Sequence, residues 1–326
     1  MTNVYNVGND SESGPEDDHA ELAELVDALD SGSSVCKDFR VQVPGSAFLA
    51  MLTSLQNPLV KQIRRLHQAK YRRQQASFLL EGTHLLQEAI ATTWPLEVVC
   101  ATPIWQVKQP QLWAQIQPIV PRIELVSPEV LAVMATTVQP DGVVAIATSR
   151  PQSLPRFTQL GLVLDQIQDP GNLGTMIRTA AAAGAEGILL SENSVDPENP
   201  KVLRASAGTW FRLPLATASL LLPQLQHYQR EGLQVVATTP TAPLEYWQVD
   251  LRRPTLVLVG NEAAGLSKPL LQLADQQVQI PLAAGVESLN AAIAAALLLY
   301  EARRQLKEKG TFGTNSRPHP NKNQAP

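Results

Sequence analysis

Five nearly continuous apolar runs punctuate the second half of the chain, and they constrain its fold more than any other feature. They occupy residues 160–165, 187–191, 233–239, 255–260 and 278–282, with helix-like segments between them. Strands buried on both faces of a parallel sheet have this composition, whereas strands with one solvated face alternate apolar and polar residues. Residues 157–309 are therefore predicted to form an α/β domain around a parallel sheet.

A smaller α/β domain is predicted over residues 51–150, because strand-like and helix-like segments also alternate there. The expected strands are 78–82, 97–102, 123–127 and 142–148, and the expected helices are 83–92, 111–116 and 128–134. Residues 150–157 carry two prolines and two arginines and are predicted to be the linker. Residues 1–50 are predicted to be an acidic disordered extension, with Met51 as a candidate native start, and residues 310–326 a disordered tail.

Several classes of protein are excluded. The longest apolar stretch, residues 291–300, is too short to span a membrane, which needs about 20 residues. The polar N-terminus lacks the pattern of a secretory signal, so a cytoplasmic location is expected. Cys36 and Cys100 lie far apart without Cys or His neighbours, which argues against a disulfide framework and a zinc site. No metal is expected.

The charge is unevenly distributed. Residues 1–50 hold ten acids against Lys37 and Arg40, a net −8, so the rest of a chain of net charge −4 carries +4. A basic amphipathic helix is predicted to follow, with Ser54 or Asn57 as N-cap and Pro58 at its first position. Its cationic residues are Lys61, Arg64, Arg65, Lys70, Arg72 and Arg73. They favour a polyanionic partner, and a solvated helix face is the alternative.

Polar residues gather where three of the predicted strands end, which is where open α/β sheets bind ligands. After strand 160–165, Asn172 and Arg178 lie six residues apart at the start of a helix. The amide could orient a hydroxyl and the guanidinium could hold a phosphate at one shared opening. A helix cap followed by a surface arginine is the alternative.

Two further strand ends carry the other polar groups. Gly260 and Glu262 follow strand 255–260, and Ser288 and Asn290 precede a long apolar helix. A tight turn and Ser288 as the N-cap are the corresponding structural alternatives. No P-loop or strand-turn-helix GxGxxG motif is present, so the standard nucleotide-binding fingerprints are missing.

In this order and spacing, the three segments resemble the SpoU, or TrmH-type, branch of the SPOUT superfamily of RNA ribose methyltransferases. The resemblance covers about residues 160–305 and includes 201–215, where Arg204, Ser206 and Gly208 match a family segment. Residues 51–150 resemble the small ribosomal-protein-like substrate-binding domain that precedes many of these enzymes. One departure is Ala291 and Ala292, where the family more often has a β-branched residue and a serine.

The resemblance implies a parallel-sheet domain whose C-terminal segment is tucked through a loop to form a trefoil knot. It also implies a homodimer in which each active site borrows an arginine from the second subunit. S-adenosylmethionine would lie in the knot, held mainly by backbone groups. The residues expected to hold it are Thr238, Thr239, Gly260, Glu262, Ile280, Leu282 and Leu289.

The implied reaction is transfer of a methyl group to a ribose 2′-hydroxyl, in ribosomal RNA rather than transfer RNA. Arg178 would bind the adjacent phosphate and assist deprotonation, and Asn172 would orient the ribose or Arg178. Glu262 would brace the loop, and Ser288 and Asn290 would complete the pocket. The six basic residues above would hold the RNA backbone.

Two alternatives stay open at this stage. One is a catalytically inactive RNA-binding assembly factor on the same fold. The other is an unrelated α/β enzyme that uses a nucleotide, such as a hydrolase or a dehydrogenase. Calorimetric binding of S-adenosylmethionine, rather than NAD or ATP, would discriminate between them.

Overall fold

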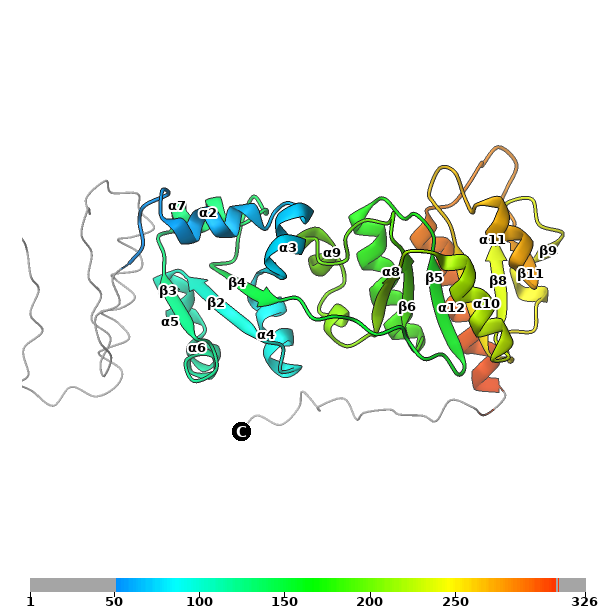
Figure 1. The fold of residues 1–326 in the computed structure, drawn as a ribbon, viewed down its shortest axis with the longest axis horizontal. Coiled ribbons are helices and arrows are strands. Elements are labelled where there is room, and N and C mark those ends of the chain that lie inside the picture. Colours follow the sequence, from blue (N-terminus) through cyan, green and yellow to red (C-terminus); the bar gives the residue numbers. More distant parts are fainter. Residues whose placement is uncertain (1–50, 309, 311–326) are drawn as a thin grey trace, which may run out of the picture.

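Two β-sheets lie one after the other along the long axis of the molecule (Figure 1). The computed structural model describes residues 51–308 and Gly310. The predictions for residues 1–50 and for nearly all of the C-terminal tail fall outside the described residues. The segment 149–157, which includes the predicted linker, contains no helix or strand and joins the two sheets.

The first sheet has four strands in the order β1-β4-β2-β3. They are β1 (Ser77–Glu81), β2 (Leu96–Ala101), β3 (Arg122–Leu125) and β4 (Val143–Thr148). β4 runs antiparallel to β1 and β2, and β3 runs parallel to β2. One core contains the apolar side chains of α2 (Pro58–Arg65) and α7 (Pro128–Met134). The other contains those of α4 (Thr83–Ala91), α5 (Pro103–Lys108) and α6 (Pro110–Ile116), so helices cover both faces of the sheet.

Local sequence signals set where these helices begin. The predicted cap at Asn57 is confirmed, because its side chain accepts a hydrogen bond from the Leu59 N–H with Pro58 at the first position. Ser127 caps α7 in the same way, and that helix has the predicted bounds. α5 was not predicted, although Thr102 followed by proline is the same starting signal.

The prediction of one continuous basic helix is wrong. The segment forms α2 and a second helix, α3 (Ala69–Gln75), separated by Leu66, His67 and an extended Gln68. The Arg72 guanidinium donates to the carbonyls of Leu66 (2.8 Å) and His67 (3.0 Å). Carbonyls at a helix C-terminus lack intrahelical partners, so Arg72 stabilises the break.

The second sheet has seven parallel strands in the order β7-β6-β5-β10-β8-β11-β9. The five predicted strands are β5 (Leu160–Leu164), β6 (Ile188–Ser191), β8 (Gln234–Thr238), β10 (Thr255–Val259) and β11 (Gln276–Gln279). β11 ends before the predicted Ile280–Leu282, where Pro281 has no N–H to pair. The short edge strands β7 (Leu215–Ala218) and β9 (Leu244–Glu245) were not predicted.

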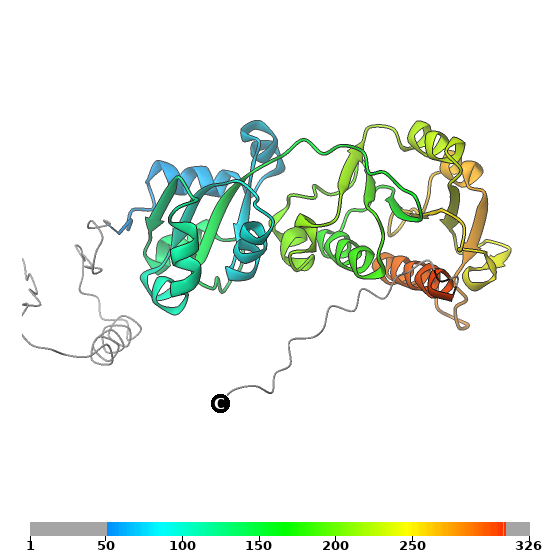
Figure 2. The same cartoon turned by 90° about the horizontal axis from the view of Figure 1, so that it is seen from below.

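Helices cover both faces of this sheet, as the unbroken apolar runs predict (Figure 2). One face packs against α8 (Pro170–Ala183), α9 (Pro200–Ala205), the 3-10 turn η1 (Thr209–Phe211) and α12 (Ala291–Glu308). The other packs against α10 (Leu221–Arg230) and α11 (Lys268–Leu273). A second 3-10 turn, η2 (Tyr246–Gln248), follows β9.

The two domains share one apolar core. The rings of Phe78 and Trp94 from the first domain pack against Trp210 and Phe211 of the second, with centroids 5.1–5.6 Å apart across the boundary. Three ion pairs also join the domains. They are Arg72–Asp196, Arg204–Glu81 and Arg212–Glu88. Arg204, singled out by the family resemblance, therefore binds a carboxylate of the first domain.

No helix among the described residues is both long and apolar enough to cross a membrane. No group of His, Cys, Asp and Glu within residues 51–308 is arranged to hold a metal ion. Cys100 is buried in β2, and that burial, with the nearby Glu124 charge, raises the pKa of its thiol to about 12.

Candidate active site

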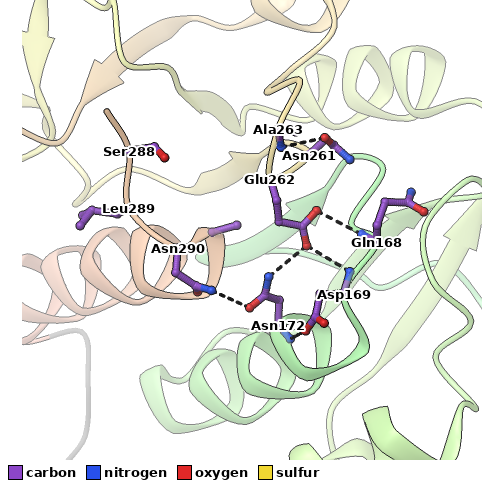
Figure 3. A pocket seen from close by; sticks show the side chains of 10 residues that line it. Gln168, Asp169, Asn172, Asn261, Glu262, Ala263, Ser288, Leu289 and Asn290 are labelled. Carbon is purple, nitrogen blue, oxygen red and sulfur yellow. Dashed lines mark hydrogen bonds between the residues drawn. The ribbon is translucent and has the colours of Figure 1, made fainter. Parts of the chain in front are cut away.

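A pocket of about 600 Å³ opens beside the carboxyl ends of β5 and β10, at the start of α8 and α12 (Figure 3). Its lining residues are Gln168, Asp169, Asn172, Asn261, Glu262, Ala263, Ser288, Leu289, Asn290 and Ala291. These come from the three segments in which the sequence placed the polar groups. Four of the five predicted catalytic residues, Asn172, Glu262, Ser288 and Asn290, line the pocket.

The start of α8 places Asn172. The Asp169 side chain accepts a hydrogen bond from the Asn172 N–H at 2.8 Å, and Pro170 is the first helical residue. Asp169 is therefore the N-cap, and Asn172 lies in the first turn with its side chain free to face the pocket. Lys201 from α9 lies 3.7 Å from the Asp169 carboxylate.

Glu262 joins the loop after β10 to the loop after β5. Its carboxylate accepts hydrogen bonds from the Asn172 amide (3.1 Å) and from the N–H groups of Gln168 and Asp169 (both 3.2 Å). Partial burial acts to raise the pKa of Glu262, but these bonds and its own N–H outweigh burial and lower the pKa below its usual value. Glu262 is therefore ionised at neutral pH and acts as an acceptor.

Asn290 extends this network to the third segment. Its Nδ2 donates to Asn172 Oδ1 at 2.8 Å, while its Oδ1 accepts from the N–H groups of Ala292 and Ile293. Asn290, and not Ser288, thus caps α12. Asn172 donates to Glu262 and accepts from Asn290, so both ends of its amide have a partner that fixes its orientation (Figure 3).

Asn261 is a pocket residue that the sequence analysis missed. Its Nδ2 donates to the Gln166 carbonyl at 2.8 Å, and its Oδ1 accepts from the N–H groups of Ala263 and Ala264. Gln166 itself has a positive φ of 57°, which L-residues seldom adopt. Asn261 comes directly after a strand and Gly260, and an asparagine beside a glycine at a strand end is typical of turns, so that signal could have identified it.

The predicted cofactor residues lie at the ends of adjacent strands. Glu262 and Leu289 line the pocket itself. Thr238 donates from its hydroxyl to the Leu258 carbonyl, and the Thr239 N–H bonds to the Val278 carbonyl. These bonds bring the ends of β8, β10 and β11 together, so Gly260, Ile280 and Leu282 start loops at the same edge of the sheet.

The backbone around this edge fits a nucleoside ligand. A Cβ on Gly260 would lie 2.4–2.6 Å from backbone atoms of Gly265 and Leu266, so only glycine allows this tight turn. Across residues 281–289, the N–H of Val286 is the sole peptide donor with a hydrogen-bond partner among the described residues. The other peptide groups there are available for the polar atoms of a ligand such as S-adenosylmethionine.

Arg178 lies apart from the other four predicted catalytic residues. It is exposed on α8 and does not line the pocket. Six residues separate it from Asn172, which places it about 9 Å farther along the helix and about 120° around it. The expectation that both side chains reach one opening is therefore not met within a single chain.

The predicted RNA-binding residues need one correction. Lys61, Arg64, Arg65, Lys70 and Arg73 are exposed. Arg72, however, has a side chain only 2% exposed and is paired with Asp196 at 2.5 Å. Its guanidinium also serves the two carbonyls at the end of α2, so it cannot hold an RNA phosphate.

Comparisons with known proteins agree with this architecture. Residues 159–300 match the model of the SpoU rRNA Methylase family, and residues 57–145 match the MRM3-like substrate binding domain. An uncharacterized tRNA/rRNA methyltransferase of Synechocystis is 52% identical over 83% of this chain and 99% of its own length. The 23S rRNA (guanosine(2553)-2'-O)-methyltransferase RlmP of Bacillus subtilis is 31% identical over 78% of this chain and all of its own.

Solved structures give the same result. An AdoMet-bound rRNA methyltransferase from Sinorhizobium meliloti has a TM-score of 0.70 and 37% identity over 78% of this chain and 98% of its own. The SpoU methyltransferase AviRb from Streptomyces viridochromogenes, in complex with AdoMet, has a TM-score of 0.69 and 29% identity over 77% and 98%. With relatives matched over nearly their whole length, the chain belongs to the SpoU rRNA methylase family.

Proposed function

We propose that this protein transfers a methyl group from S-adenosylmethionine to a ribose 2′-hydroxyl of ribosomal RNA. The observation that carries the proposal is the network of Glu262, Asn172 and Asn290, which joins three strand-end segments around one pocket. RlmP, matched over its whole length, is named as a 23S rRNA 2'-O-methyltransferase. Family membership removes the alternative of an unrelated hydrolase or dehydrogenase.

The pocket residues have separate roles in an in-line displacement at the methyl group. S-adenosylmethionine, when bound, supplies a methyl group already activated by its sulfonium. Glu262 braces the loops after β5 and β10, and Asn290 and Glu262 together hold the Asn172 amide in one orientation toward the ribose. Ser288 and Leu289 complete the wall of the pocket. Holding the hydroxyl in line with the methyl group lowers the entropic part of the barrier.

We also propose that the active protein is a homodimer and that Arg178 enters the pocket of the second subunit. Arg178 is exposed and absent from the pocket of its own chain. On α12, Ile293 and Tyr300 are each about half exposed, and half-buried Ala296 and Leu297 lie between them. These positions share one helix face, and such an apolar stripe is suited to a two-fold interface. The partner's Arg178 would bind the phosphate beside the reactive ribose.

Replacement of Arg178 by alanine tests the catalytic assignment. Methyl transfer to ribosomal RNA in single-turnover assays should fall by at least about 10²-fold, since phosphate positioning and help with the hydroxyl proton are both lost. S-adenosylmethionine affinity should stay within about twofold of the wild type, and Arg178→Lys should not restore activity, because an ammonium lacks the planar fork. Arg230→Ala, at an exposed arginine on the opposite face of the sheet, is the matched control. Activity of Arg178→Ala within about tenfold of wild type would contradict the proposal.

Mixed dimers test the exchange of Arg178 between subunits. Equal amounts of Arg178→Ala and Asn172→Ala chains, each expected to be inactive alone, are unfolded together and reassembled. If Arg178 acts across the interface, half of the dimers are mixed and hold one complete site of two, so about one quarter of wild-type activity returns. A mixture that forms mixed dimers but stays inactive would show that Arg178 acts within its own chain.

The choice of RNA needs a separate measurement. Ribose-methylation mapping of total RNA from a deletion strain should show one lost 2′-O-methyl group in ribosomal RNA. A loss in transfer RNA instead would contradict that part of the proposal. Unchanged maps, together with inactive purified protein, would favour the RNA-binding assembly factor without activity.

A further inference from the structure

A second pocket, of about 540 Å³, lies in the first domain where α2 and α3 meet. Its lining residues are Gln56, Pro58, Lys61, Gln62, Arg65, Tyr71, Gln74 and Gln75. No residue is shared with the active-site pocket, which lies in the other domain. Its volume is within the range of sites that hold small ligands.

The chemistry of this pocket combines an aromatic ring, amides and cations. Among the described residues, none of the four glutamine side chains has a hydrogen-bond partner, so their amides can bind a ligand. Lys61 and Arg65 are exposed beside them, and no acidic residue occurs between residues 51 and 80. The pocket therefore suits an anion that carries hydrogen-bonding edges.

Tyr71 supplies a flat apolar surface. Its ring is half-buried, with the Arg65 guanidinium carbon 5.8 Å and the Lys70 ammonium 6.0 Å from the ring centroid. Flat groups in direct contact lie about 3.5–4 Å apart, so neither cation is stacked tightly on the ring. A planar base can therefore stack on Tyr71 beside a guanidinium, as unpaired bases do on aromatic and arginine side chains.

The pocket exists because the basic segment is broken into two helices. The break is held by Arg72, which bonds the two carbonyls that end α2 and pairs with Asp196 of the methyltransferase domain. A ligand in this pocket would therefore be held at a fixed distance from the catalytic domain. Duplex RNA cannot present a base here, because its bases are paired and stacked.

We propose that this pocket binds one unpaired nucleotide of the RNA substrate. The base stacks on Tyr71, the amides of Gln62 and Gln74 bond to its edge, and Lys61 and Arg65 hold the flanking phosphates. This goes beyond backbone binding by the basic segment, since it predicts selection of RNA with an unpaired position. It rests on the proposed function only in that the partner is RNA.

The test uses the full chain and single-stranded RNA of about twelve nucleotides containing 2-aminopurine, with a blunt duplex of the same length as a second probe. Tyr71→Leu removes the ring, and Tyr71→Phe keeps it. Single-strand affinity, from fluorescence anisotropy, should fall about fivefold or more in Tyr71→Leu, the lower end of what one base stack contributes. Tyr71→Phe should stay within about twofold and retain the quenching of 2-aminopurine that Tyr71→Leu loses.

Two controls make the outcome specific. Duplex affinity should be the same in Tyr71→Leu and wild type, and S-adenosylmethionine affinity should be unchanged, which reports an intact fold. Among the arginines, Arg65→Gln should weaken single-strand binding more than Arg73→Gln, because Arg65 lines the pocket and Arg73 does not.

Single-strand affinity of Tyr71→Leu within about twofold of wild type, or equal losses for the two probes, would overturn the proposal. A different result would separate the two proposals. If the wild-type protein binds the single strand through Tyr71 but methylates no RNA, the proposed function is refuted, whereas the assignment of this pocket to an unpaired nucleotide stands.

Discussion

Arg72→Ala is the substitution that best separates a structural role from an RNA-binding role in the basic segment. The Arg72 guanidinium makes two hydrogen bonds to Asp196, at 2.9 and 2.5 Å, and one to each of the Leu66 and His67 carbonyls. The side chains of Arg72 and Asp196 are only 2% and 13% exposed. The variant leaves the Asp196 carboxylate and both carbonyls without these donors.

The expected loss is large. Removal of one partner from a buried ion pair costs about 3–5 kcal/mol of the free energy of unfolding, because the remaining charge stays buried without compensation. Glu198 adds to this effect. Burial and the nearby Asp196 charge raise the pKa of the Glu198 carboxyl. The hydrogen bond from Ser149 and the positive charge of Arg72 act to lower that pKa. In the variant, two neighbouring carboxylates would face each other without the cation.

The direction of the pH dependence follows from that shift. A carboxyl whose folded pKa is raised binds more protons in the native state, so stability falls as pH rises from its ordinary pKa of 4.5 through the raised value. Without the positive charge of Arg72, the pKa of Glu198 is raised further. The destabilisation of Arg72→Ala should therefore be greater at neutral pH than at about pH 5.

Urea unfolding provides the assay, because the fluorescence of Trp94 and Trp210 reports the contact between the domains. Arg73→Ala, at the adjacent exposed arginine, should change stability by no more than about 0.5 kcal/mol. RNA binding is measured in parallel as a function of salt. Two results together would refute the structural reasoning. The free energy of unfolding of Arg72→Ala would lie within about 0.5 kcal/mol of wild type, and the slope of log RNA affinity against log salt concentration would fall by about 0.7–0.9. Arg72 would then be a phosphate contact.

Three further perturbations have defined outcomes. Glu262→Gln should lower the free energy of unfolding by about 1 kcal/mol at neutral pH. Because the folded pKa of Glu262 is lowered, the difference in stability between variant and wild type should be present above pH 4.5 and disappear as pH falls through the folded pKa, which thermal melts can follow. Gly260→Ala should weaken S-adenosylmethionine binding, measured by calorimetry, by about tenfold or more, since its Cβ would displace the backbone of Gly265. A chain that starts at Met51 should fold and methylate RNA like the full chain, and a loss of either would show that residues 1–50 are needed.

The sequence predicted the architecture of the second domain well because its signals are local. Leu160–Leu164 and Thr255–Val259 are buried at every position, so their composition alone identifies central parallel strands. Gln276–Gln279 has one fully buried residue, Val278, and the apolar run after it misled the assignment. The trefoil knot stays a prediction from the family resemblance.

The site was predictable to the level of segments but not of contacts. Parallel strands end at one edge of a sheet, so residues after β5 and β10 had to be neighbours. That Asn290 rather than Ser288 caps α12, and that Asn172 bonds to Glu262, depends on side-chain geometry in loops. Periodicity carries no information about that geometry.

The prediction for Arg72 was wrong for the same reason. Charge clustering is read from neighbours in sequence, whereas Asp196 lies 124 residues away. Nothing local distinguishes Arg72 from Arg73, although one is buried and the other exposed. An arginine in a basic cluster can therefore serve the fold when the cluster lies at a domain boundary.

The loop that contains Asp196, the partner of Arg72, also contacts the segment that leads to Asp169 and Asn172. In residues 191–196, Ser191 and Ser194 accept hydrogen bonds from the N–H groups of Gln166 and Ile167, while Asp196 holds Arg72. Gln166 is the residue with positive φ, so its conformation depends on this support. A disturbed substrate-binding domain would therefore reach the Asp169–Asn172 turn through one short loop. Asp196→Asn should thus lower the rate of methyl transfer more than it lowers S-adenosylmethionine affinity, and equal losses would show that the loop does not couple the two domains.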